Sequence, residues 1–94
     1  MSRVKNWCFT LNNYSDAEYH AIFPPVENGP QRLSTLLDYA CVGKEISPTG
    51  TSHLQGFVCL RIRGRLSTVR SILPRAHWEV ARTVEAAIDY CKKD

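Results

Sequence analysis

The sequence has no apolar run approaching the roughly 20 residues that a membrane-spanning helix needs. Its first residues also lack the apolar stretch and cleavage site of a signal peptide. There is no internal repeat, low-complexity segment or linker, and 94 residues can bury one small core. We therefore expect a single domain over residues 1–94, without a membrane segment.

The cysteines lack a metal-binding pattern. Cys8, Cys41, Cys59 and Cys91 form no C-x-x-C pair, so the usual zinc-binding spacing is absent. Most of them lie in strand-like runs, where a thiol packs as a small hydrophobic side chain. We expect an intracellular protein without disulfide bonds. The net charge of +3 permits an anionic partner but does not require one.

The hydrophobic pattern predicts the element order β-α-β-β-α-β-α. Strands are expected at residues 6–12, 39–46, 52–62 and 77–82, and helices from residue 15 to the prolines at 24–25, at 66–73 and at 84–93, with a short helical turn at 32–37. Ser15 and Glu18 have the spacing of a capping box. The order predicts an α+β fold of the ferredoxin-like or RRM-like split βαβ type, with a central antiparallel sheet and two helices on one face. The C-terminal helix is an addition that can cover part of the open face.

A candidate metal site lies on the predicted hairpin. His53 and Gln55 are two residues apart in one strand, so their side chains point to the same face, whereas Leu54 points into the core. If this strand pairs with the one before it, Glu45 comes near both polar side chains. A carboxylate oxygen, an imidazole nitrogen and an amide oxygen suit a hard or borderline divalent ion, Mn²⁺ or Mg²⁺. The alternative is that these residues form only the polar outer face of a strand.

A candidate nucleophile lies on the last predicted helix. Tyr90 and Lys93 are three residues apart, hence on one helical face. A tyrosine hydroxyl is a poor nucleophile near neutral pH because its pKa is about 10, but a nearby cation can compensate. The alternative is a packing residue whose hydroxyl lies in water.

Polar residues at the end of the first strand are candidates for nucleic-acid binding. Thr10, Asn12 and Asn13 can hydrogen-bond to bases or phosphates. An Asn-rich turn ahead of a helix cap explains the same residues without any ligand.

Basic residues gather at the end of the third predicted strand, at Arg61, Arg63 and Arg65. Arg61 and Arg63 lie on the same face of the strand as His53 and Gln55, so they could form a basic surface that binds a phosphate backbone. The alternative is a solvated rim of charge.

Three motifs occur in order along the chain, at residues 9–13 (FTLNN), 53–57 (HLQGF) and 90–93 (YCKK). With Glu45, they resemble the motif set of rolling-circle replication initiators, the HUH-type endonuclease domain of Rep proteins, in particular those of circovirus-like and cyclovirus-like single-stranded circular DNA viruses. HUH enzymes generally have His-hydrophobic-His. This chain has Gln55 at the second His position, as in the circovirus-like branch, and the single tyrosine of its third motif resembles the single-tyrosine enzymes.

The resemblance implies metal-dependent, sequence-specific nicking and joining of single-stranded DNA at the stem-loop of a viral replication origin. Glu45, His53 and Gln55 would hold Mn²⁺ or Mg²⁺, and Tyr90 would form a covalent 5′-phosphotyrosine link. Lys93 would support the geometry of the metal site, the charge of the phosphate or the proton balance of Tyr90.

The resemblance also implies a setting for this activity. Proteins of the family usually carry a helicase domain after the nuclease and act in the host cell nucleus. We therefore interpret the chain as a nuclease domain, monomeric in isolation, with the helicase domain in cis in the full-length protein.

Two other functions fit the predicted fold. An RNA-recognition module has the same element order and stacks bases on sheet aromatics, for which Tyr39 and Phe57 could serve. The aromatic-rich signature of those modules is absent from the sequence. A purely structural interaction domain would leave the placement of Glu45, His53, Gln55 and Tyr90 as coincidence.

Overall fold

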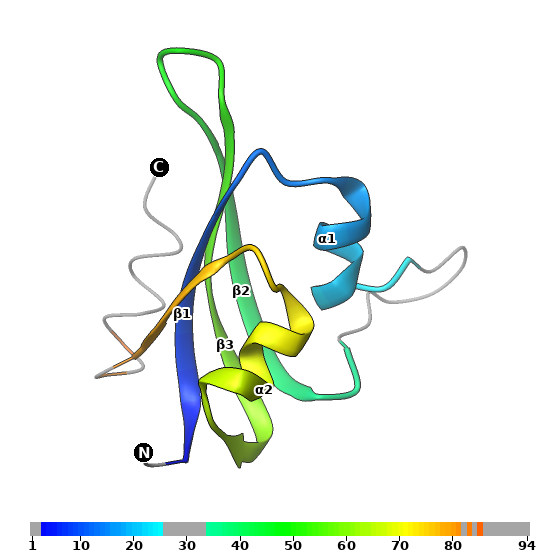
Figure 1. Cartoon of the computed structure of the whole chain (residues 1–94), viewed down its shortest axis with the longest axis vertical. Coiled ribbons are helices and arrows are strands. Elements are labelled where there is room, and N and C mark those ends of the chain that lie inside the picture. Colours follow the sequence, from blue (N-terminus) through cyan, green and yellow to red (C-terminus); the bar gives the residue numbers. More distant parts are fainter. Residues whose placement is uncertain (1–2, 26–33, 82, 84, 86–94) are drawn as a thin grey trace.

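The computed structural model describes residues 3–25, 34–81, 83 and 85 (Figure 1). Within these residues the strands are β1 (Val4–Asn12), β2 (Leu37–Ile46), β3 (Ser52–Gly64) and β4 (His77–Val80), and the helices are α1 (Asp16–Ile22) and α2 (Leu66–Ile72). The order β1-α1-β2-β3-α2-β4 is the predicted one. The helix expected at 84–93 falls almost entirely outside the described residues. Among the residues described, no helix has the length and apolar character needed to cross a membrane.

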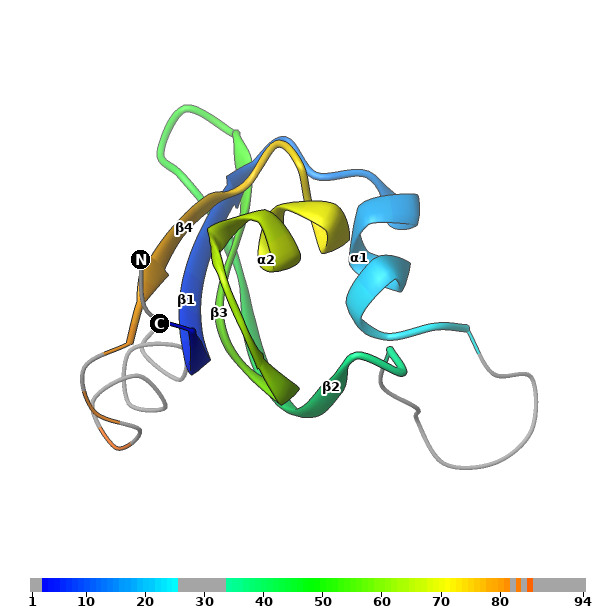
Figure 2. The same cartoon turned by 60° about the horizontal axis from the view of Figure 1, so that its bottom comes forward.

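The four strands form one antiparallel sheet in the order β2-β3-β1-β4, so β3 and β1 lie in its centre. Because β1 and β2 both pair with β3, the chain returns through α1 to a strand parallel to the first. β3 and β4 both pair antiparallel with β1, one on each side of it, so they run parallel to each other. The segment that contains α2 connects them. Both helices lie against the same face of the sheet (Figure 2). The structure thus confirms an α+β fold with a four-stranded antiparallel sheet and two helices.

The face of the sheet toward the helices forms the core. Trp7, Phe9 and Leu11 alternate along β1 and are each at most 2% exposed, as their period-two spacing predicts. From β3, Leu54 and Val58 join the same cluster, which also takes in the buried apolar side chains of both helices. Alternation along β1 and around Leu54 in β3 therefore fixes the core face, and on the other face of β3 the Phe57 ring is also buried.

Gly56 allows a close approach within this core. A Cβ atom built at this position would lie 2.7 Å from the carbonyl oxygen of Cys41 and 3.0 Å from Cε1 of Phe9. The first distance is shorter than real Cβ contacts allow, and the atom it meets belongs to the backbone of β2. Glycine in the motif at residues 53–57 is therefore a packing requirement of the hairpin and the Phe9 ring.

Three local expectations are corrected. β1 begins at Val4 and β3 continues to Gly64, because these two residues pair beyond a register shift and extend the ladder. Of the helical turn expected at 32–37, the described residues keep one hydrogen-bonded turn, in which Leu37 N–H donates to the carbonyl oxygen of Ser34 at 3.0 Å, and Leu37 is already the first residue of β2. Cys41 is disulfide-bonded, contrary to expectation.

Candidate active site

The face of the sheet away from the helices carries the predicted metal ligands in adjacent rows. In the first row, His53 of β3 lies between Glu45 of β2 and Asn12 of β1. In the second row, Gln55 lies between Gly43 and Thr10. The hairpin between β2 and β3 therefore has the register that the sequence suggested, and it brings Glu45 opposite His53.

Glu45 and Gln55 are in direct contact. Gln55 Nε2 donates a hydrogen bond to Glu45 Oε1, a diagonal pair across the two strands. Gly43 faces Gln55 directly and has no side chain, so the glutamine can reach along the strand to the carboxylate. Glu45, His53 and Gln55 are all half-buried, which keeps them accessible to a ligand while shielding them partly from water.

The His53 ring is oriented by Asn12. His53 Nδ1 lies 2.5 Å from Asn12 Oδ1. Because an amide oxygen can only accept a hydrogen bond, Nδ1 is the donor in this pair, and in the neutral ring the lone pair lies on Nε2. Histidines that bind metals commonly donate their other ring N–H to an oxygen in this way. The contact with Asn12 therefore occupies Nδ1 and leaves Nε2 as the nitrogen through which a neutral ring could coordinate.

The corner that carries Asn12 is fixed from the helix side of the molecule. Asn13 has a left-handed backbone, with φ of 52°, and its N–H donates to the carbonyl oxygen of Ser52 at 2.7 Å. Arg75 Nη2 donates to the carbonyl oxygens of Asn12 and Asn13, at 3.4 and 3.1 Å. Arg75 thus bridges the end of β1 to the segment that follows α2.

Glu18 holds Arg75 in that position. Arg75 Nη2 lies 2.7 Å from Glu18 Oε1, and Arg75 Nε lies 3.0 Å from Oε2. Hydrogen bonding from Arg75 lowers the pKa of Glu18, with a further contribution from the backbone N–H of Ser15. Glu18 also completes the predicted capping box of α1, since its own N–H donates to Ser15 Oγ at 3.1 Å. One carboxylate therefore serves the start of α1 and the corner beside His53.

The donor set fits a hard or borderline divalent cation. Glu45, His53 and Gln55 offer one charged oxygen, one nitrogen and one neutral oxygen once the amide is turned toward the ion. Across residues 3–25, 34–81, 83 and 85, no group of three or more His, Cys, Asp and Glu side chains gathers to hold a metal. The candidate site here takes its third ligand from the glutamine Gln55, so it is not a group of three such side chains. Only one of these three ligands, Glu45, is charged. Water or a bound phosphate would therefore have to fill the remaining coordination positions of a divalent ion.

The predicted DNA-binding residues separate into two groups. Thr10 and Asn12 lie beside the ligand set, and Asn13 forms the adjoining corner. The arginines lie toward the other end of β3, and ten residues at about 3.3 Å each place Arg63 roughly 30 Å along the strand from His53. The structure therefore brings only the residues of β1 to the ligand set.

The three arginines also differ from one another. Arg61 pairs with Asp38 at 3.4 Å, so its charge is partly balanced. Arg63 lines a cavity of about 370 Å³ together with Arg3 and Lys5, and none of the described residues that line this cavity is acidic. Arg65 is the N-cap residue of α2. Among the described residues, Arg63 is thus the one of the three that lies in a cluster of basic side chains.

Two predicted catalytic residues, Tyr90 and Lys93, lie outside the described residues. Sequence reasoning missed Arg75 and Glu18 as supports of the site, because their contacts join positions more than 50 residues apart. It also missed His77 and Glu79 on β4. Their alternation with buried Trp78 was a usable signal, since it places both on the face of Thr10.

Base stacking on Phe57 does not fit this surface. Phe57 is 1% exposed, and its ring lies 6.0 Å from that of Tyr39. A buried ring offers no face to a base, so the RNA-recognition alternative loses one of its two candidate platforms.

Fold and site together define a small α+β domain whose sheet presents a polar, metal-compatible face. The family model described as "Putative viral replication protein" matches residues 4–94. The chain belongs to this family.

The relatives of the chain include replication-associated proteins of viruses and a Para-Rep protein of an alphasatellite. The replication-associated protein of Pigeon circovirus is 43% identical over 96 residues, which cover 97% of this chain and 27% of that protein. The replication-associated protein of Beak and feather disease virus is 39% identical over 94 residues, which cover 99% of this chain and 30% of that protein. Para-Rep C2 of Subterranean clover stunt C2 alphasatellite is 36% identical over 96 residues, which cover 97% of this chain and 31% of that protein. The resemblance to circovirus-like Rep domains is confirmed, and the chain spans less than a third of each of these relatives.

Proposed function

We propose that this domain nicks and rejoins single-stranded DNA at a viral replication origin and so starts and ends rolling-circle replication. The observation that carries the proposal is the meeting of Glu45, His53 and Gln55 on the open face of the sheet. It is supported by membership of a family whose relatives are named replication-associated proteins. The strand order β2-β3-β1-β4 supports the ferredoxin-like split βαβ arrangement as the scaffold.

Glu45, His53 and Gln55 would hold Mn²⁺ or Mg²⁺. Bound there, the ion would polarise the scissile phosphate and balance its charge. His53 would coordinate through Nε2, because Nδ1 is engaged by Asn12. Gln55 would turn its amide oxygen toward the ion, giving up the hydrogen bond to Glu45. Asn12 therefore acts as a positioning residue for the ring as well as a group near the strand.

Tyr90 would attack the scissile phosphorus through its hydroxyl oxygen. The new bond joins this oxygen to phosphorus, the bond from phosphorus to the 3′-oxygen breaks, and the leaving oxygen takes up a proton as a free 3′-hydroxyl. Attack by a 3′-hydroxyl on the phosphotyrosine reverses the step and reseals the strand. The exchange conserves the number of phosphodiester links, so no nucleotide cofactor is consumed. Lys93 would support the metal site, the phosphate or the Tyr90 proton.

The DNA strand would lie along the open face of the sheet. Thr10, Asn13 and the amide nitrogen of Asn12 would contact it near the scissile phosphate. Arg61, Arg63 and Arg65 would contact the backbone toward the far end of β3. The isolated domain would work as a monomer, with a helicase domain in cis in the full-length protein and the host nucleus as the place of action.

A covalent-adduct assay tests this proposal. We would incubate the protein and Mn²⁺ with a stem-loop origin oligonucleotide labelled at its 3′ end and separate the products on a denaturing gel. The expected result is a labelled band at the mass of protein plus DNA, lost in Tyr90→Phe and retained in Tyr39→Phe, a matched control on β2. Cleavage retained by Tyr90→Phe would reject the mechanism.

A further inference from the structure

The cavity of about 370 Å³ lies at the end of the sheet where β1 begins, and its lining includes the basic side chains of Arg3, Lys5 and Arg63. In Figure 1 the start of β1 lies at the bottom and the hairpin between β2 and β3 lies at the top. Glu45 and His53 pair beside that hairpin. The basic cavity therefore lies at the opposite end of the sheet from the proposed metal ligands.

A break in the strand register brings Arg63 to this cavity. Asn6 pairs with Cys59 and Val4 pairs with Gly64, so β1 advances by two residues while β3 advances by five. Extra residues on one strand form a bulge, and bulges change the direction in which side chains point. Arg63 therefore does not follow the simple alternation of the first half of β3, and it lies beside the start of β1.

The backbone around the cavity is fixed by its neighbours. The N–H of Ala81 donates to the carbonyl oxygen of Asn6 at 3.0 Å, which ties the end of β4 to β1. At Gly64 an added Cβ atom would lie 2.8 Å from Cβ of Thr68, so β3 approaches the first turn of α2 closely at this point. A site whose backbone is already ordered loses less conformational freedom when a ligand binds.

The lining of the cavity offers donors and positive charge. None of the described residues that line it is acidic. Two other arginines differ in this respect, because Arg61 pairs with Asp38 and Arg75 pairs with Glu18. Guanidinium and ammonium groups only donate hydrogen bonds, and phosphate oxygens accept them. The lining therefore suits an anion with several oxygen atoms.

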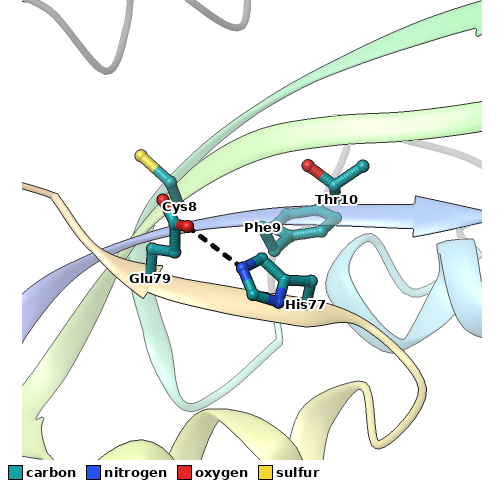
Figure 3. A pocket seen from close by; sticks show the side chains of 5 residues that line it. All are labelled: Cys8, Phe9, Thr10, His77 and Glu79. Atoms are coloured by element: carbon teal, nitrogen blue, oxygen red, sulfur yellow. Dashed lines mark hydrogen bonds and ion pairs between the residues drawn. The ribbon is translucent and has the colours of Figure 1, made fainter.

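A second cavity beside β1 has the opposite character. It has a volume of about 280 Å³, and its lining includes His77 and Glu79 of β4 (Figure 3). Figure 3 shows the imidazole ring and the carboxylate facing each other, and His77 Nε2 lies 3.0 Å from Glu79 Oε1. The carboxylate repels a phosphate. Of these two cavities, the basic one therefore suits the DNA backbone.

We propose that the basic cavity binds a phosphate of the DNA backbone and anchors the DNA at the end of the sheet opposite the metal ligands. Arg63 would form paired N–H···O bonds to the phosphate, while Arg3 and Lys5 would balance its charge. The adjoining sugar would pack against Val80, which is 50% exposed. No base takes part, so the contact is independent of sequence. This inference rests on the proposed function and adds Arg3 and Lys5 to the residues that hold the DNA.

The anchor lies well away from the scissile phosphate. Lys5 and Asn12 are separated by seven steps along β1, which at about 3.4 Å each amount to roughly 24 Å. Phosphates of one duplex strand are about 3.4 Å apart along the helix axis, so this distance spans roughly seven base pairs, or fewer nucleotides of an extended single strand. Phosphates of the unpaired strand and of the stem share the same chemistry, and two probes distinguish them.

The salt dependence of DNA binding tests the anchor without metal or cleavage. We would measure the affinity of the whole chain for a single-stranded oligothymidylate and for a stem-loop oligonucleotide by fluorescence anisotropy, in EDTA and over a range of salt concentrations. Lys5→Gln and Arg63→Gln should each lower the affinity about fivefold and reduce the slope of log affinity against log salt by about 1. Arg70→Gln, which removes the same charge from an exposed position on α2, is the matched control and should leave both nearly unchanged.

The two probes identify the source of the phosphate. A loss of affinity for oligothymidylate assigns the anchored phosphate to the unpaired strand, and a loss seen only with the stem-loop assigns it to the paired stem. Unchanged affinity and slope for both probes in Lys5→Gln and Arg63→Gln would overturn the inference. An equal loss in Arg70→Gln would also overturn it, because net charge alone would then explain the effect.

A second measurement locates the contact. In ¹⁵N NMR spectra, saturation with the oligonucleotide that shows the loss should shift the amide signals of Lys5 and Asn6. In Arg63→Gln these shifts should disappear while the shift at Thr10 persists. An unshifted Lys5 signal in the wild type would overturn the inference. If the covalent adduct with Mn²⁺ still forms in that case, the anchor fails while the proposed nicking function stands.

Discussion

The two faces of the sheet use the same strands for different purposes. On the helix face, Leu54 is fully buried and joins the apolar core. On the open face, its neighbours His53 and Gln55 are half-buried beside a carboxylate and an asparagine. Around Leu54, successive residues of β3 therefore alternate between the buried core and the half-buried candidate site. Substitutions one position apart should affect different properties of the protein, and this expectation can be tested residue by residue.

The largest effect is expected on the helix face. Leu54→Ala removes a side chain with no exposed surface and leaves a cavity, so it should lower the free energy of unfolding by about 3 kcal/mol. Urea denaturation followed by tryptophan fluorescence measures the change. Ile62→Ala, which truncates a side chain that is 78% exposed on the same strand, is the matched control and should change stability by less than about 0.5 kcal/mol. Comparable losses in the two variants would contradict the assignment of the core face.

The neighbouring residue should show the reverse behaviour. His53→Ala removes a proposed ligand from a half-buried site, so Mn²⁺ affinity should fall at least about 100-fold while the unfolding free energy changes little. Isothermal titration calorimetry measures the affinity. Gln55→His supplies the commoner ligand of the superfamily and should retain Mn²⁺ binding. Unchanged affinity in both His53→Ala and Glu45→Ala would show that the ligand set is wrong.

Asn12→Ala separates positioning from coordination. Without the amide oxygen, His53 Nδ1 loses its partner at 2.5 Å and the ring is free to change tautomer. Mn²⁺ affinity should fall about tenfold, as is usual for a residue that orients a ligand. The metal-free protein provides an independent readout, because ¹⁵N NMR of the imidazole should show Nδ1–H in the wild type and mixed tautomers in the variant. A wild-type ring protonated only at Nε2 would exclude this role.

The smallest effect is expected at the clamp behind Asn12. Arg75 lowers the pKa of Glu18 in the folded state, so the pair stabilises the protein above the ordinary glutamate pKa of about 4.3. This stabilisation is lost as the pH falls through the lowered, folded-state value. Glu18→Gln should therefore cost about 0.5–1 kcal/mol at pH 7, and the difference from wild type should shrink below pH 4. Thermal unfolding across this pH range measures it, and a difference that grows on acidification would contradict the sign.

The alternation of side chains predicted most of what the sheet does. Because the period of a strand is two residues, the sequence was enough to separate Leu54 from His53 and Gln55 and to place Glu45 across the hairpin. The capping box at Ser15 was equally local and equally predictable.

Contacts between distant segments could not be predicted in this way. The bond from Asn12 to His53 spans 41 positions, and that from Arg75 to Asn13 spans 62. Neither follows from periodicity, because each depends on how β1 meets β3 and on where the chain turns after α2. The end of the turn expected at 32–37 could not be placed either, because the local sequence does not reveal that Leu37 pairs with Leu60 across the sheet.

The position at which added Mn²⁺ binds is the most direct test of the proposed metal site. Mn²⁺ is paramagnetic, so substoichiometric addition to the ¹⁵N-labelled chain broadens the amide signals nearest to the ion. We predict that broadening begins at Glu45, His53 and Gln55, extends to Asn12 and Thr10 on the neighbouring strand, and spares the arginine end of β3. Broadening that begins elsewhere, or that persists unchanged in His53→Ala, would contradict a metal site on the open face.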